Sequence, residues 1–133
     1  MPRIEPITSP EVVEYPGLWS NCLRVGDTIY LSGLTARAND KTTILGVGSA
    51  YEQTRVIFTK VKALLEAAGA GMSQVVTMTI YLTDMADNRE VWRARAEFFE
   101  GAFPCSTLVQ VAALATPEIL VEITVQARAD ATG

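Results

Sequence analysis

Apolar and polar residues alternate on both sides of Gly26-Asp27, which is the pattern of a β-hairpin. One alternating segment covers residues 23–25 and the other covers residues 29–31. A two-residue connection that begins with glycine allows the tight turn that joins two antiparallel strands. The sequence therefore predicts a hairpin near its N-terminal quarter.

Two stretches have the apolar period of an amphipathic helix. The first begins at Ser49, which forms an S-x-x-E capping pair with Glu52, and ends near Gly69. The second begins at Asp87, whose carboxylate can cap the first turn, and ends near Gly101. Each helix has one apolar stripe, which is typical of helices that cover one face of a sheet.

Three further segments are rich in β-branched residues and predict strands: residues 75–84, 107–114 and 120–128. We interpret the last two as a closing hairpin, which would hold Cys105, Ser106 and Glu122 close together. The whole chain, 1–133, is expected to be one domain, with an extended arm at residues 1–18. The element order predicts two helices packed as a layer over one face of a single sheet.

The charge balance argues against nucleic acid as a partner. The chain has 15 acidic and 11 basic residues, a net charge of −4. Nucleic-acid binding depends largely on basic groups that neutralise phosphates. Arg89, Arg93 and Arg95 are close in sequence, but acidic residues are interleaved with them, as on an ordinary solvated helix face.

Cysteine, histidine and hydropathy patterns exclude further classes of site. Two distant cysteines provide neither a disulfide framework nor metal-ligand spacing, so we expect no metal. The chain has no histidine, so the Cys105 thiol and the Ser106 hydroxyl lack a general base; we interpret Cys105 as a buried structural thiol. We find neither a signal-peptide pattern nor an apolar run that could span a membrane. Together with the free thiols, this predicts a cytoplasmic protein without a membrane partner.

Several ordered motifs resemble one family. "YLSGLTAR", "EQTRVIFTKVKALLEAAGAGMSQVVTMTIYLTDMAD", "AEFF" and "LVEI" look like the reactive-intermediate deaminase family (RidA, or YjgF), over about Trp19 to Ala127. The resemblance implies an α+β fold like that of the trimeric chorismate mutases, with two helices packed on one face of a single mixed β-sheet. The same resemblance implies small-molecule clefts between the subunits of a homotrimer. It also implies cofactor-free hydrolysis of 2-imino or 2-enamino acids to 2-oxo acids and ammonia. "SGLTAR" with "QTR" is similar to the branch that deaminates 2-aminomuconate.

The sequence departs from this family where the family binds its ligand. Family deaminases read P-A-R-[ST] before the penultimate strand, and that arginine binds the substrate carboxylate. Here the stretch contains Cys105 and Ser106, and Ser106 stands in the arginine's place. In the same comparison the arm tyrosine becomes Trp19, the second-helix asparagine becomes Trp92, and a closing-strand cysteine becomes Leu108.

The residues that remain suggest how a ligand could be held. Glu122 is the candidate catalytic base, because a partly desolvated carboxylate can activate water. Arg37, in the loop after Ser32-Gly33, is the candidate replacement for the missing arginine, and the glycine allows a ligand to approach the main chain. The candidate substrate-binding residues are Trp19, Ser32, Gly33, Arg37, Trp92, Cys105 and Ser106.

Three functions compete. The first is a deaminase that hydrolyses an imine or enamine. The second is a non-catalytic protein that binds an aromatic or hydrophobic ligand, as Trp19 and Trp92 suggest. The third is a ribonuclease, an old name for some relatives, and the acidic charge and missing histidine argue against it.

Overall fold

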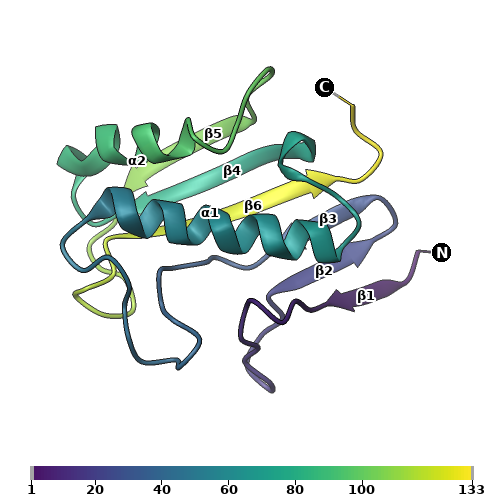
Figure 1. Cartoon of the computed structure of the whole chain (residues 1–133), viewed down its shortest axis with the longest axis horizontal. Coiled ribbons are helices and arrows are strands. Elements are labelled where there is room, and N and C mark those ends of the chain that lie inside the picture. Colours follow the sequence, from purple (N-terminus) through teal and green to yellow (C-terminus); the bar gives the residue numbers. More distant parts are fainter. Residues whose placement is uncertain (1, 133) are drawn as a thin grey trace.

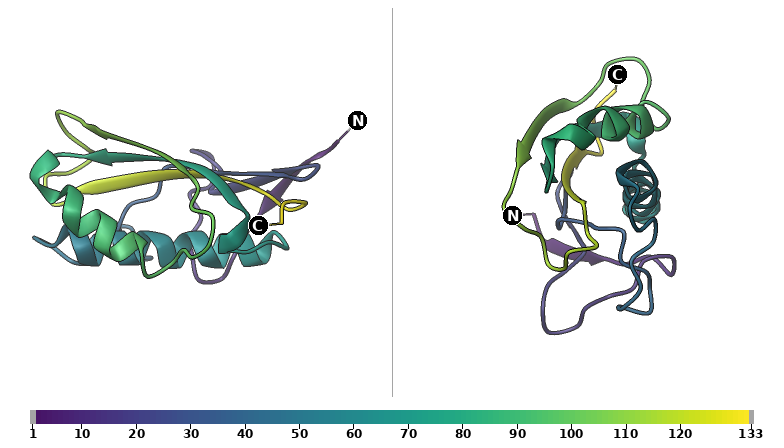
Figure 2. Two further views of the ribbon diagram at one scale, coloured as in Figure 1. Left: turned by 90° about the horizontal axis from the view of Figure 1, so that it is seen from above. Right: turned by 90° about the vertical axis from the view of Figure 1, so that its left-hand side faces the viewer.

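Residues 2–132, which the computed structural model describes, form a six-stranded mixed sheet that carries two α-helices on one face (Figures 1 and 2). The strand order is β1-β2-β3-β6-β4-β5, and only the β4–β5 pair is parallel. The strands are β1 (Ile4–Ile7), β2 (Cys22–Val25), β3 (Thr28–Leu31), β4 (Val75–Leu82), β5 (Cys105–Gln110) and β6 (Val121–Arg128). The helices are α1 (Ala50–Ala67) and α2 (Asn88–Arg95), with 3₁₀ turns at Met72–Gln74 and Met85–Asp87. The predicted α+β fold class is confirmed.

The N-terminal hairpin and α1 form where the local patterns predict them. Gly26 has a φ of +59°, which matches the glycine requirement of the β2–β3 turn. The Ser49 hydroxyl accepts a hydrogen bond from the Glu52 amide at 3.1 Å and so caps α1. Gly69, with a φ of +84°, follows the C-cap Ala68 and ends the helix.

The predicted closing hairpin is wrong, because β5 pairs with β4 and not with β6. β4 and β5 run parallel, with Met78 opposite Ser106, and α2 provides the crossover that a parallel pair requires. β6 lies on the other side of β4, with Tyr81 opposite Glu122. β4 therefore separates Ser106 and Cys105 from Glu122.

The second helix differs from its prediction at both ends. Asp87 makes no capping hydrogen bond to α2; instead Asp84 caps the preceding 3₁₀ turn by accepting from the Ala86 amide at 2.9 Å. The regular helix ends at Arg95 and not near Gly101. The chain turns there because the following Phe98 and Phe99 pack against the core.

The core lies between the helices and the inner face of the sheet. Phe58 of α1 is fully buried, and its ring lies 5.5 Å from that of Phe98 and 5.4 Å from that of Phe99. The alternate residues Val121, Ile123, Val125 and Ala127 of β6 face this core, so Glu122 points to the opposite side of the sheet.

The predicted arm is partly a strand. Ile4 to Ile7 pair antiparallel with β2, and the chain then forms a loop that runs to β2. Figure 1 shows this loop and the segment after β3 below the α1–β6 layer, where the two segments flank one end of the sheet.

Candidate functional site

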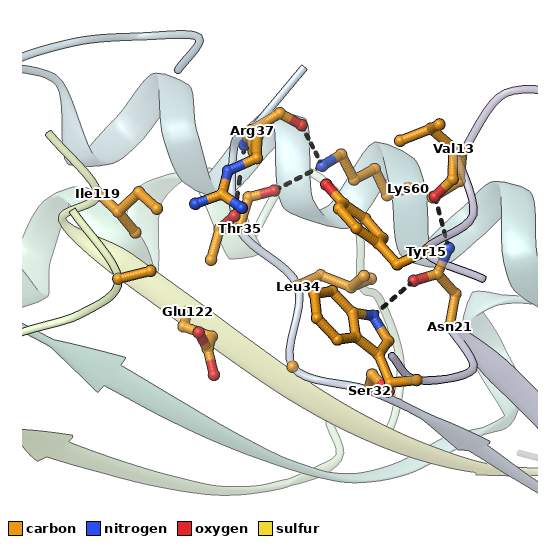
Figure 3. A pocket seen from close by; sticks show the side chains of 14 residues that line it. Val13, Tyr15, Asn21, Ser32, Leu34, Thr35, Arg37, Lys60, Ile119 and Glu122 are labelled. Atoms are coloured by element: carbon orange, nitrogen blue, oxygen red, sulfur yellow. Dashed lines mark hydrogen bonds between the residues drawn. The ribbon is translucent and has the colours of Figure 1, made fainter. Parts of the chain in front are cut away.

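A cavity of about 300 Å³ lies between the N-terminal loop, the segment after β3, α1 and β6 (Figure 3). Five of the predicted site residues line it: Trp19, Ser32, Gly33, Arg37 and Glu122. Its other lining residues are Val12, Val13, Tyr15, Asn21, Leu34, Thr35, Lys60, Ala115 and Ile119. The fold thus brings together residues that are more than a hundred positions apart in the sequence, such as Trp19 and Glu122.

Glu122 presents a partly buried carboxylate to this cavity. Burial raises the pKa of Glu122 above its usual range, because the charged form loses solvation. The carboxylate packs against Gly33: a Cβ atom at position 33 would lie only 3.0 Å from Cδ of Glu122. The backbone does not require glycine here, because the φ of Gly33 is not in the left-handed region. The missing side chain is what allows the Glu122 carboxylate to approach so closely.

Arg37 extends into the cavity from the loop that follows β3. In Figure 3 its guanidinium lies on the same side as Ile119 and above Glu122 in that view. Within residues 2–132 no acidic side chain forms an ion pair with it, and its side chain makes no hydrogen bond. A half-buried guanidinium without a partner is suited to an anionic ligand.

Lys60 of α1 fixes the loop that carries Arg37. Its ammonium donates hydrogen bonds to the Thr35 carbonyl at 2.7 Å and to the Arg37 carbonyl at 2.6 Å. Burial, reinforced by the nearby charge of Arg37, lowers the pKa of Lys60 to about 8. Sequence reasoning missed this residue. The available signal was a lysine at the edge of the apolar stripe, beside the buried Val61.

An aromatic pair forms another wall of the cavity. The rings of Tyr15 and Trp19 stack with centroids 4.4 Å apart and an angle of 24° between their planes. The indole N–H of Trp19 donates to Oδ1 of Asn21 at 3.2 Å, and the buried Asn21 amide donates in turn to the Val13 carbonyl at 2.8 Å. Tyr15 and Asn21 were not predicted, because the N-terminal loop has no periodic pattern.

Ser32 lines the cavity, but its hydroxyl and its backbone amide both donate hydrogen bonds to main-chain carbonyls. Its hydroxyl donates to the Ser20 carbonyl at 2.6 Å, and its amide donates to the Asn21 carbonyl at 2.9 Å. The hydroxyl oxygen can still accept a hydrogen bond from a ligand. This pairing orients the strand end so that Gly33 meets Glu122.

Trp92, Cys105 and Ser106 do not line this cavity. They lie on α2 and at the start of the edge strand β5. Cys105 is exposed, so its interpretation as a buried structural thiol is wrong; the residue faces away from the helices on an edge strand. The Ser106 hydroxyl accepts a hydrogen bond from Nη1 of Arg95 at 2.9 Å. If these residues belong to the same site, a second copy of the chain must supply them.

Comparisons with known proteins agree with the fold and the sequence motifs. A family model described as Endoribonuclease L-PSP matches residues 12–129. A 2-iminobutanoate/2-iminopropanoate deaminase of Dermatophagoides farinae is 34% identical over 111 residues, which cover 81% of this chain and 84% of that protein. The chain belongs to the RidA/YjgF family.

Further proteins are similar to this RidA/YjgF chain in sequence or in fold. A RutC family protein of Pyrococcus horikoshii is 32% identical over 80% of this chain and 83% of its own. A crystal structure of a protein of unknown function from Pseudomonas aeruginosa superimposes with a TM-score of 0.85 at 40% identity, covering 98% and 95% of the two chains. A Rid family protein from Yersinia pestis gives a TM-score of 0.87 at 27% identity, covering 95% and 99%.

Two classes of feature are missing from the described part of this RidA/YjgF chain. Among residues 2–132 no group of three or more histidine, cysteine or acidic side chains could hold a metal ion. No helix in the same range has the length and apolar character needed to cross a membrane. The charged groups that line the cavity are the Glu122 carboxylate, the Arg37 guanidinium and the Lys60 ammonium, beside the Tyr15–Trp19 wall.

Proposed function

We propose that the chain is a cofactor-free imine or enamine deaminase that hydrolyses a 2-imino or 2-enamino acid to a 2-oxo acid and ammonia. One observation carries this proposal: the cavity holds an unpaired guanidinium, Arg37, together with a partly desolvated carboxylate, Glu122. The first group suits the carboxylate of an imino acid, and the second suits activation of water. The deaminase relative from Dermatophagoides farinae supports the same reaction class.

The reaction would proceed in two proton-balanced steps. In the first, Glu122 accepts a proton from water as the water oxygen adds to the carbon of the protonated C=N bond, which gives a carbinolamine. In the second, the carboxylic acid returns that proton to nitrogen, the C–N bond breaks and ammonia leaves. The electron pair of the hydroxyl oxygen forms the carbonyl of the 2-oxo acid, and the hydroxyl proton is released. The raised pKa of Glu122 makes it a stronger base than an exposed carboxylate.

Arg37 and Lys60 would bind and orient the substrate. The Arg37 guanidinium can form two parallel hydrogen bonds with a carboxylate. Lys60 fixes the main chain on which Arg37 is carried and adds positive charge to the same end of the cavity. Holding the substrate carboxylate there would place its imine carbon towards Glu122.

The assembly that we propose is a cytoplasmic homotrimer with clefts between its subunits. Within residues 2–132, no helix or second sheet covers the face of the sheet opposite α1 and α2 (Figure 2). Tyr30 and Val109 point to this face and are 46% and 38% exposed, so the face carries large apolar side chains that a neighbouring subunit could cover. A neighbouring subunit would then bring Trp92 and the start of β5 to the cavity.

Ammonia release from 2-iminobutanoate, generated in place by an amino-acid oxidase, tests the activity. Glu122→Gln and Arg37→Gln should each lower kcat/KM by a hundredfold or more, on the order of 10²–10⁴ for a lost general base. Arg89→Gln is the matched control, because Arg89 is exposed and lies outside the cavity. No rate above buffer for the wild-type protein, or full activity in Glu122→Gln, would exclude this function.

The aromatic wall favours a second candidate, a non-catalytic protein that binds a flat or hydrophobic ligand. Tyr15 and Trp19 are stacked and held in place before any ligand binds, as in sites that bind planar molecules. Ligand quenching of tryptophan fluorescence that is lost in Trp19→Phe would support binding at this cavity. Turnover of the same ligand would return the protein to the first candidate.

We do not propose the ribonuclease activity that the description of the family model names. The sequence has no histidine to serve as general acid or base, and its net charge is −4. Single-stranded RNA binding requires a positively charged groove along the backbone, with aromatic residues on which bases stack. The cations at this cavity are instead confined to one end of a small pocket.

A further inference from the structure

Two arginines in the described chain are half-buried and have no acidic partner. Four others form ion pairs: Arg24, Arg55, Arg93 and Arg128. Arg3 and Arg89 are exposed, so water solvates them. Arg37 and Arg95 remain, and within residues 2–132 neither is paired with a carboxylate. A guanidinium that loses water without gaining an anion is unfavourable unless a ligand supplies the anion.

Arg95 is held in place at the edge of the sheet. It lies in the last turn of α2, and its Nη1 donates to the Ser106 hydroxyl at 2.9 Å. Burial lowers the pKa of Arg95, in agreement with its partial desolvation. The guanidinium has five N–H donors in a planar fork, and Ser106 uses one of them. An edge of the fork is therefore free for a carboxylate.

One chain cannot bring Arg95 and Glu122 to the same small ligand. In the β4–β5 pair Ser106 is opposite the buried Met78, so Ser106 and Arg95 lie on the helix side of the sheet. Glu122 is opposite Tyr81, and it points to the other side. β4 lies between the two strands.

We propose that Arg95, positioned by Ser106, reaches the cavity of a neighbouring copy and binds the substrate carboxylate there together with that copy's Arg37, at the end opposite its Glu122. This inference rests on the proposed function and identifies a binding residue that the sequence pattern did not indicate. The arginine is carried by the helix, and the strand serine orients it. Ser106 is a positioning residue, because its hydroxyl contacts Arg95 and not the ligand.

Binding of 2-oxobutanoate, the unreactive product, tests Arg95 without requiring turnover. By calorimetry, Arg95→Gln should weaken this carboxylate at least tenfold, and should leave the uncharged analogue 2-oxobutanamide unchanged. Ser106→Ala should weaken 2-oxobutanoate less than Arg95→Gln does. Arg93→Gln is the control, because Arg93 is exposed and already paired with Glu90. Equal affinity for 2-oxobutanoate in Arg95→Gln and the wild type, or no binding by the wild type, would overturn the proposal.

Mixed assemblies test whether the residue acts across copies. Arg95→Gln and Glu122→Gln chains with different tags are co-expressed, and the mixed oligomers are purified through both tags. If each cavity takes Glu122 from one copy and Arg95 from the next, every mixed trimer has one intact cavity out of three. The purified mixed assemblies should therefore restore about one third of the wild-type rate. If the Arg95→Gln and Glu122→Gln proteins are each inactive and the mixed oligomers release no ammonia either, the proposed sharing between copies is overturned. If the wild type releases no ammonia, the deaminase function fails, whereas the binding comparison above still decides the role of Arg95.

Discussion

Replacing Gly33 with alanine would place a methyl group directly against the carboxylate of Glu122. The new Cβ would lie 3.0 Å from Cδ and 3.2 Å from Cγ of that side chain. Carbon atoms in good contact are about 3.5–4.0 Å apart, so the carboxylate must retreat by roughly 0.5–1 Å. The backbone itself is not strained, because Gly33 does not have a positive φ.

The expected cost falls on activity and not on stability. Overpacking in a rigid core costs about 1–3 kcal/mol, but the group that moves here is the end of a flexible side chain. Replacing glycine by alanine also restricts the unfolded chain, which stabilises by about 0.4–1 kcal/mol. The free energy of unfolding should therefore change by less than about 1 kcal/mol. A displacement of about 1 Å at a catalytic group can lower the rate about 10²-fold.

Ammonia release and thermal unfolding, measured on the same preparations, separate the two effects. Gly71→Ala is the matched control, since a Cβ atom there meets open space and its φ is also not positive. The double variant with Glu122→Gln completes a cycle. Once the carboxylate is lost, Gly33→Ala should cause little further loss of kcat/KM.

Three results would refute this reasoning. Full activity in Gly33→Ala would mean that the position of the Glu122 carboxylate does not limit the reaction. Equal and additive losses in the two backgrounds would mean that Gly33 acts through some group other than Glu122. A fall in Tm as large as that of a core cavity variant would show instead that the segment after β3 is rigid and cannot yield.

Three further predictions concern Glu122, Lys60 and Ser49. Burial raises the pKa of Glu122, so its ionised form destabilises the folded state at neutral pH. Glu122→Gln should therefore raise Tm at neutral pH. This gain should vanish in acid, where the carboxyl is protonated in both the folded and the unfolded state. A gain that persists in acid would contradict this cause. Lys60→Met removes the hydrogen bonds from the ammonium to the carbonyls of Thr35 and Arg37, each worth about 1.5–3 kcal/mol. Part of this loss is offset because a buried charge is also removed, so the free energy of unfolding in urea should fall by about 1–3 kcal/mol. The binding of 2-oxobutanoate should weaken as well. Unchanged unfolding and binding would show that the lysine does not fix the loop. Ser49→Ala should cost about 1 kcal/mol in the same assay through loss of the α1 cap, with no effect on ligand binding.

Much of the secondary structure could be predicted from the sequence, because its signals are local. The turn at Gly26, the cap at Ser49 and the stop at Gly69 each depend on neighbours a few residues away. The family motifs predict Glu122 and Arg37 as site residues. The second helix was less well predicted, since the packing of Phe98 and Phe99 on Phe58 ended it early.

Strand pairing and the composition of the cavity were decided by the tertiary structure. The alternation of β5 and β6 fits a hairpin as well as it fits two strands separated by β4, because residue patterns do not specify which strand is the neighbour. Lys60 and the Tyr15–Trp19 stack reach the cavity only when α1 and the N-terminal loop pack beside β6. The contact between Arg95 and Ser106 likewise depends on the parallel crossover through α2. The sequence by itself determined the elements and the candidate base, whereas long-range packing determined which charged groups share a site, since that depends on contacts between distant segments.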